Sequence, residues 1–169
     1  MTLSVNAQTK YIKAESFSST LTYTMKNPLH DWTGDSDEFN CSIEYDAANR
    51  KIKSVEAEAI IISFDSNIKM RNKNAFKMLD SNLFPVVKFV ADDISLLDNT
   101  LIIVGLLTFH GVTHPIKFAA TQVLVKNQLS VKGKFSIKLT DFKLQPPSLL
   151  GLKADDNIDI KFAMNFVVE

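Results

Sequence analysis

The side chains best suited to chemistry in this chain are its three histidines. His110 and His114 are four residues apart, but Gly111 and Pro115 place them around a turn and not on one face of a helix. Together with His30 they could bind a metal ion, and a small metal-dependent hydrolase is therefore one hypothesis for the function. No further ligand has a recognisable spacing, so hydrogen-bonded turn histidines are the favoured interpretation.

Other catalytic patterns are missing from the sequence. The paired carboxylates Asp92 and Asp93, and Asp155 and Asp156, fall at predicted strand ends, where turn acids are common. The glycines form neither a phosphate-binding loop nor a nucleophile elbow. A single cysteine, Cys41, excludes an internal disulfide and a cysteine-based metal site. We therefore predict no catalytic residue, no bound metal and no cofactor.

One stretch near the middle of the chain has the spacing of a helix, whereas the rest has the periodicity of strands. Asp65, Ser66 and Asn67 are all N-cap residue types and precede it. We predict a helical insertion over about residues 67–80. Its cations, among them Arg71, could contact a lipid headgroup or make transient contact with an anionic membrane.

Eight segments alternate between apolar and polar residues in the manner of half-buried strands. We predict an all-β fold, an eight-stranded antiparallel lipocalin-like barrel, because closure removes exposed sheet edges. Residues 9–169 are predicted to form this single domain. The predicted strands are residues 16–25, 39–45, 51–63, 86–96, 100–108, 113–126, 129–139 and 157–168.

Phenylalanine is unusually frequent, with 12 residues against 1 tryptophan and 3 tyrosines. Phe can line an apolar cavity without a hydrogen-bond partner, and a barrel of this size can hold one small ligand. We predict a long apolar pocket with the helix at its mouth. The alternative is a barrel filled by its own side chains, which acts as an interaction module. The candidate lining residues are Phe17, Tyr23, Trp32, Phe39, Phe64, Phe76, Phe89, Phe109, Phe135, Phe142, Phe162 and Met164.

The overall charge and the first residues bear on partners and location. The 19 Lys and Arg balance the 19 Asp and Glu, so no net field attracts nucleic acid. Val5, Asn6 and Ala7 fit the small-residue pattern before a signal-peptidase site. Residues 1–8 are therefore expected to be either a remnant of a secretory signal or a disordered start. The first of these interpretations predicts a periplasmic or secreted protein.

Three stretches, taken in order, resemble the YceI family of polyisoprenoid-binding proteins, and together they span nearly the whole chain. Lys138, shortly before the Asp-Phe pair of the third stretch, stands where many members have an arginine, and with Arg71 it is a candidate for contact with a headgroup. The stretches are residues 64–89, which include Arg71-Asn72 and Leu83-Phe84-Pro85; residues 105–115, GLLTFHGVTHP; and residues 133–142, GKFSIKLTDF, followed by the strand from Asp156 to Ile160.

The resemblance implies a lipocalin-like antiparallel barrel that takes a long isoprenoid chain into its interior. Members of the family are often periplasmic or secreted, which agrees with the location predicted from the first residues. The predicted function is non-enzymatic binding, with transport or storage, of a long-chain isoprenoid lipid of the polyprenyl or quinone type. The predicted partners are this lipid, a membrane in transient contact and a second copy in a homodimer, with no nucleic acid.

Overall fold

Most of the chain belongs to one antiparallel β-sheet. The computed structural model describes residues 9–169, so the predictions for residues 1–8 lie outside the described part. Eleven strands follow one another across the main sheet. In spatial order they are β1 (Thr9–Lys13), β4 (Phe39–Asp46), β5 (Lys51–Ile60), β7 (Val86–Leu97), β8 (Thr100–Phe109), β9 (Val112–Val125), β10 (Gln128–Lys138), β13 (Asn157–Val167), β2 (Thr20–Met25), β3 (Trp32–Ser36) and β6 (Phe64–Asp65).

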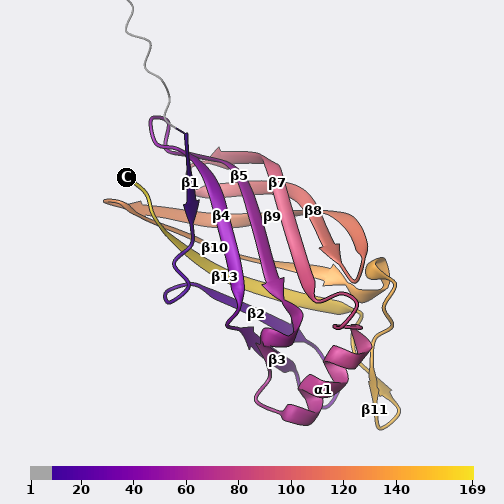
Figure 1. The fold of residues 1–169 in the computed structure, drawn as a ribbon. Helices are drawn as coiled ribbons and strands as arrows, with labels where there is room; N and C mark the ends of the chain where they lie inside the picture. Colours follow the sequence, from indigo (N-terminus) through magenta and orange to yellow (C-terminus); the bar gives the residue numbers. More distant parts are fainter. Residues whose placement is uncertain (1–8) are drawn as a thin grey trace, which may run out of the picture.

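The sheet curls strongly into a half-barrel (Figure 1). On one side of the curl, the amide of Glu15, just after β1, donates a hydrogen bond to the Asn165 carbonyl in β13 at 2.8 Å. Strand alternation then gives the sheet an inner and an outer face. In β10, for example, Val131 and Ile137 are buried whereas Lys132 and Lys138 are exposed. The predicted all-β, lipocalin-like antiparallel fold is confirmed, with more strands than the eight predicted.

All eight predicted strands occur, and five short strands were not predicted. One of these, β3, lies between the first two predicted strands in sequence, and it pairs with β2 through Tyr23 and Gly34. Conversely, the third predicted strand is too long: β5 ends at Ile60 and a short 3-10 helix, η1 (Ile61–Ser63), follows. These differences lie at strand ends and in short edge strands, where few residues contribute to the alternating pattern.

The predicted helical insertion is confirmed as α1 (Lys69–Met78), although it begins two residues later than expected. None of the three candidate N-cap residues caps it, because the cap position is the extended Ile68 and it makes no side-chain cap bond. Asn72 stabilises the helix start in their place. Its Oδ1 accepts hydrogen bonds from the Ser66 amide at 3.0 Å and from the Ser66 hydroxyl at 2.6 Å.

A second structure lies beside α1 at the same end of the half-barrel (Figure 1). After β10 the chain forms a 3-10 helix, η2 (Leu139–Phe142), and then a hairpin of β11 (Ser148–Leu149) and β12 (Leu152–Lys153). Asp156 holds η2 in place, since its carboxylate accepts hydrogen bonds from the Thr140 amide at 3.0 Å and hydroxyl at 2.6 Å.

Within residues 9–169, no helix has the length and apolar character needed to cross a bilayer.

Candidate functional site: the apolar cavity

The half-barrel encloses a cavity of about 650 Å³, within the range of small-molecule binding sites. Its walls come from the inner face of the sheet, and α1 and the β11–β12 hairpin border one end. At the other end, lining residues such as Ile43, Leu101 and Phe166 are at most 2% exposed. At the α1 end, Ile68 is 47% exposed and Met70 is 66% exposed. The cavity therefore opens beside the helix, as the sequence predicted, and the barrel is not filled by its own side chains.

Ten of the twelve residues predicted to line a pocket border this cavity. Phe135 stacks on Phe118 with ring centroids 4.7 Å apart, while Phe89 and Phe162 lie 5.6 and 5.8 Å from Phe118. These rings group together and leave the remaining space open. The ten are Tyr23, Trp32, Phe39, Phe64, Phe76, Phe89, Phe109, Phe135, Phe162 and Met164.

Two of the twelve predicted positions are wrong. Phe17 is 86% exposed because residues 16–18 form a turn, so the strand alternation that placed Phe17 inside starts only at Thr20. Phe142 is 1% exposed but lies in η2, outside the cavity. Its ring packs against Phe109 and His114, with centroids 5.4 and 5.9 Å apart. Phe142 therefore supports the cavity wall from behind.

Of the two predicted headgroup contacts, Arg71 borders the cavity and Lys138 does not. Lys138 follows the inward-facing Ile137 in β10, so the alternation of the strand points it to solvent. Arg71 extends from the first turn of α1 across the indole of Trp32, with its guanidinium carbon 5.3 Å from the ring centroid. Its Nη2 lies 3.1 Å from Nε2 of His30. A cation over an indole face is stabilised by the ring quadrupole.

The mouth also holds a buried polar atom without a partner. The indole nitrogen of Trp32 is buried and makes no hydrogen bond to any of residues 9–169. Close by, burial raises the pKa of the Tyr23 hydroxyl, while the charge of Arg71 lowers it and that of Asp65 raises it. Tyr23, Trp32 and Arg71 thus make a small polar group on the edge of an apolar cavity. Buried donors without a partner are uncommon, and an unseen water, an ion or a functional role can account for them.

The start of α1 is tied to the sheet by a short hydrogen-bond chain. Asn72 donates from Nδ2 to Asp65 Oδ1 at 2.7 Å, and the Asn67 amide donates to the same oxygen at 2.8 Å. These two bonds, with that from Asn72 the stronger influence, lower the pKa of Asp65. Because Arg71 precedes Asn72, these hydrogen bonds hold the stretch of backbone from which the Arg71 side chain extends.

The histidines do not form a metal site. His30 contacts Arg71, His114 contacts the Pro115 carbonyl at 3.0 Å, and His110 lies between the Phe142 carbonyl at 3.1 Å and Asp80 at 3.3 Å. No group of three or more His, Cys, Asp or Glu in residues 9–169 is arranged to hold a metal ion. The hydrolase hypothesis therefore loses the arrangement on which it depended.

Sequence reasoning missed several cavity residues. Phe118 and Phe166 border the cavity, and so does Cys41, whose burial raises its pKa to about 12. The alternation of β9 and β13 could have identified the two phenylalanines. No sequence signal marks the polar residues that α1 and the hairpin contribute, such as Asn74 and Gln145, because their position depends on how these elements fold over the mouth.

An antiparallel half-barrel around an apolar cavity, with a helix at the mouth, defines a lipocalin-like class of binding architecture. The family model of the YceI-like domain matches residues 12–166. The chain therefore belongs to the YceI-like family. No curated protein matches the sequence.

Solved structures share this fold. BcnA of Burkholderia cenocepacia is 21% identical with a TM-score of 0.80, covering 90% of this chain and 98% of that one. A polyisoprenoid-binding domain from Saccharophagus degradans is 15% identical with a TM-score of 0.75, covering 96% and 100%. The YceI protein of Campylobacter jejuni is 19% identical with a TM-score of 0.71, covering 80% and 84%. At these identities the similarity establishes the fold alone.

Proposed function

We propose that this protein binds a long-chain isoprenoid lipid in the cavity, without covalent chemistry, and carries or stores it. The observation that carries the proposal is the open apolar cavity of about 650 Å³ behind α1. The similarity to a domain described as polyisoprenoid-binding supports the same ligand class. The chain's membership of the YceI-like family is consistent with a binding protein.

The energetics suit reversible transfer. Burying one methylene group is favourable by about 0.8 kcal/mol, so a chain of some tens of carbons exceeds the ~4–15 kcal/mol cost of association. In a membrane, however, the chain is already out of water. The net preference for the protein over the bilayer is then small, and the lipid can be both taken up and released.

The polar end of the lipid is assigned to the mouth. Arg71 offers a fixed positive charge, and the unpartnered indole N–H of Trp32 offers a hydrogen-bond donor. Both groups recognise an oxygen acceptor, which a polyprenyl phosphate or a quinone carries and an isoprene chain lacks. The chain would extend from there toward the buried end of the cavity near Leu101 and Phe166.

Native mass spectrometry of the full chain, with extraction of any lipid that travels with it, tests the proposal. We expect either a co-purified isoprenoid or stoichiometric uptake of an added polyprenyl phosphate. A protein that is empty and also refuses added polyprenyl lipids would refute it. The periplasmic or secreted location and the homodimer stay predictions, which cell fractionation and sedimentation equilibrium would test.

A further inference from the structure

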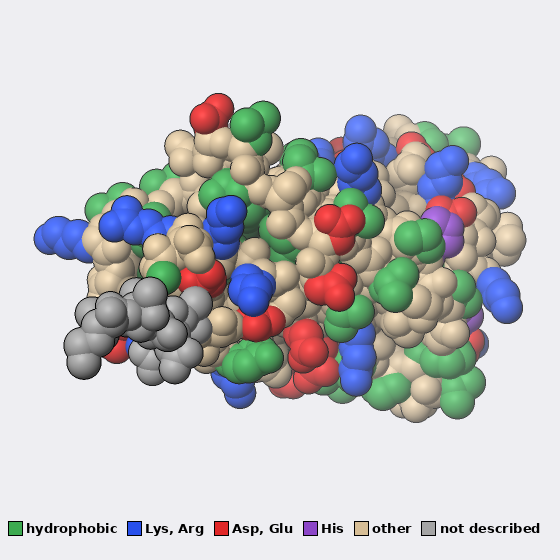
Figure 2. Space-filling view, turned by 90° about the horizontal axis from the view of Figure 1, so that it is seen from above, with side chains coloured by type: hydrophobic (Ala, Val, Ile, Leu, Met, Phe, Trp, Pro, Cys, Tyr) green, Lys and Arg blue, Asp and Glu red, His purple; other side chains and the backbone are tan. Residues whose placement is uncertain are grey.

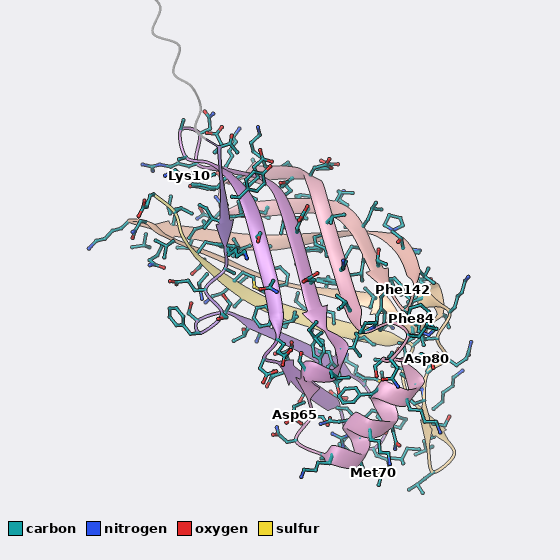
Figure 3. All side chains as sticks on the ribbon, viewed as in Figure 1. Lys10, Asp65, Met70, Asp80, Phe84 and Phe142 are labelled. Carbon is teal, nitrogen blue, oxygen red and sulfur yellow. The ribbon has the colours of Figure 1, made fainter. Side chains whose placement is uncertain are left out.

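Apolar side chains at the cavity mouth continue outward onto the surface. Ile68, Met70 and Leu149 border the cavity and are 47%, 66% and 39% exposed. At the tip of the β11–β12 hairpin, Leu150 is 86% exposed and Leu152 is 41% exposed. Figure 3 shows Met70 at the outermost end of the molecule on the α1 side. We call these five residues the mouth rim; exposed apolar residues gathered in this way mark an interaction site.

Cations lie beside the mouth rim without ion-pair partners among residues 9–169. Helix α1 contains four cations and no acid, and residues 143–154 contain two lysines and no acid. None of these six makes an ion pair with a carboxylate in the described residues. The opposite end differs, since Figure 2 shows acidic and basic side chains interspersed there. In a chain of zero net charge, helix α1 and residues 143–154 are therefore two positively charged segments beside the rim. The six are Lys69, Arg71, Lys73, Lys77, Lys143 and Lys153.

These cations do not stabilise helix α1. Lys69, Lys73 and Lys77 are spaced four residues apart, so three like charges lie along one exposed face and repel one another. Lys69 and Arg71 also sit in the first turn, which has no acid, and there they oppose the helix dipole. A negatively charged surface outside the protein would relieve both penalties.

We propose that the mouth rim and its cations dock the protein on an anionic lipid bilayer. The apolar side chains enter the interface while the lysines contact lipid headgroups, the pattern of interfacial helices. A bilayer fits better than a protein partner, because protein interfaces are depleted in lysine and enriched in aromatic residues, whereas this surface has five lysines and an aliphatic rim. The inference rests on the proposed function in that docking places the cavity mouth against the membrane that holds the isoprenoid.

Flotation of the full chain with lipid vesicles tests the docking surface. We expect binding to vesicles of phosphatidylcholine with phosphatidylglycerol, weaker binding in high salt, and little binding to phosphatidylcholine alone. Replacing two lysines of the exposed face of α1, in Lys69→Gln/Lys73→Gln, should weaken partitioning by about 30-fold, since each cation near an anionic surface raises the affinity roughly fivefold. Leu150→Glu/Leu152→Glu, at two rim residues that do not border the cavity, should weaken it at least about tenfold by removing apolar contact.

Leu97→Glu is the matched control, because Leu97 is 75% exposed at the opposite end of β7 from α1. It should bind vesicles as the wild type does. Equal losses in the control and the mouth variants, or no wild-type binding to anionic vesicles, would overturn the proposal. So would a change in self-association without a change in vesicle binding, which would assign the rim to a second copy.

Farnesol binding, measured in solution by the fluorescence of Trp32, separates this inference from the proposed function. The mouth variants should bind farnesol like the wild type, because they alter the surface and leave the deep cavity intact. Failure to dock with farnesol binding intact overturns the docking proposal alone. Docking without farnesol binding, in contrast, supports the docking surface and counts against the proposed function.

Discussion

Filling the cavity should block long isoprenoids while leaving the fold intact. Ala57 in β5 borders the cavity and lies between Cys41 of β4 and Phe89 of β7 in the strand register. In Ala57→Phe, the new ring would project into a space of about 650 Å³. A phenyl ring fills roughly 100 Å³, the volume of about three liquid waters. The variant should therefore fold around its ring and keep part of the cavity.

The expected loss of affinity follows from the displaced volume. The space taken by the ring would otherwise hold about four methylene groups, so a chain that fills the cavity should lose about 3 kcal/mol of binding free energy, or roughly 10²-fold in affinity. A short isoprenoid such as geraniol should lose little, because room for it remains. Trp32 is the only tryptophan and borders the cavity, so its fluorescence reports both titrations.

The stability of the variant supplies the second half of the test. Urea unfolding should show Ala57→Phe to be less destabilised than Gly105→Ala, although the first adds a ring and the second a methyl group. A Cβ on Gly105 would lie 2.5 Å from the Val90 carbonyl oxygen and 2.7 Å from the Ala91 Cβ, and such overpacking typically costs ~1–3 kcal/mol. The reasoning is refuted if Ala57→Phe is the more destabilised, or if it binds long chains with wild-type affinity.

Three further outcomes are expected. Arg71→Gln should weaken binding of a polyprenyl phosphate by about tenfold or more, because a charge-assisted hydrogen bond is lost, and leave binding of the matching alcohol unchanged in the same fluorescence titration. Burial raises the pKa of Cys41 to about 12, so at pH 8 its thiolate fraction should be over 10³-fold lower than that of an ordinary cysteine of pKa about 8.5. A water-soluble thiol reagent should therefore label Cys41 slowly until the protein is unfolded or the pH approaches 12. Asn72→Ala should raise the pKa of Asp65 toward its ordinary value in a carboxyl NMR titration, because the hydrogen bond from Asn72 is the main cause of its lowering. The lowered pKa stabilises the fold above about pH 4, and this contribution is lost as the pH falls. The difference in unfolding free energy between wild type and variant should therefore narrow in acid.

Alternation along the chain predicted the strands well, because long strands with one buried face repeat the same signal several times. The strand β10 is an example, since its alternation from Leu129 to Ile137 matches its burial. Short strands near the edge of the sheet, such as β3, escaped notice because Gly34 and Asp35 have little strand preference and pair only because β2 and β6 lie on either side of β3. The same limit explains Phe17, where the alternation was extended into a turn.

The residues that position the helix depend on contacts across the fold, which a local pattern does not contain. Asp65, Ser66 and Asn67 have the composition of a helix cap, yet Asn72 turns back from inside the helix to bind the first two of them. The pairing of Arg71 with Trp32 likewise joins residues about forty positions apart. The apolar interior of the cavity and the position of Arg71 at its mouth were predictable, whereas the contacts of Arg71 with Trp32 and His30 were not.

The three stretches that resemble the family meet at one joint outside the cavity, and the contacts made there concern the framework. His110, from the second stretch, packs edge-on against Phe84 of the first with ring centroids 4.7 Å apart. Its Nδ1–H donates to the Phe142 carbonyl of the third stretch, and its Nε2 lies 3.3 Å from Asp80 after α1. Figure 3 shows Asp80, Phe84 and Phe142 close together.

Backbone geometry at this joint supports the same conclusion. Gly111 has a φ of +71°, and a Cβ there would lie 2.6 Å from the Phe84 ring, so only glycine fits both requirements. The joint holds the end of α1 against η2 and so sets where the helix lies over the mouth. Similarity at Phe84, His110 and Phe142 therefore reports the framework, whereas under the proposed function a headgroup would contact Arg71 and Trp32 at the mouth.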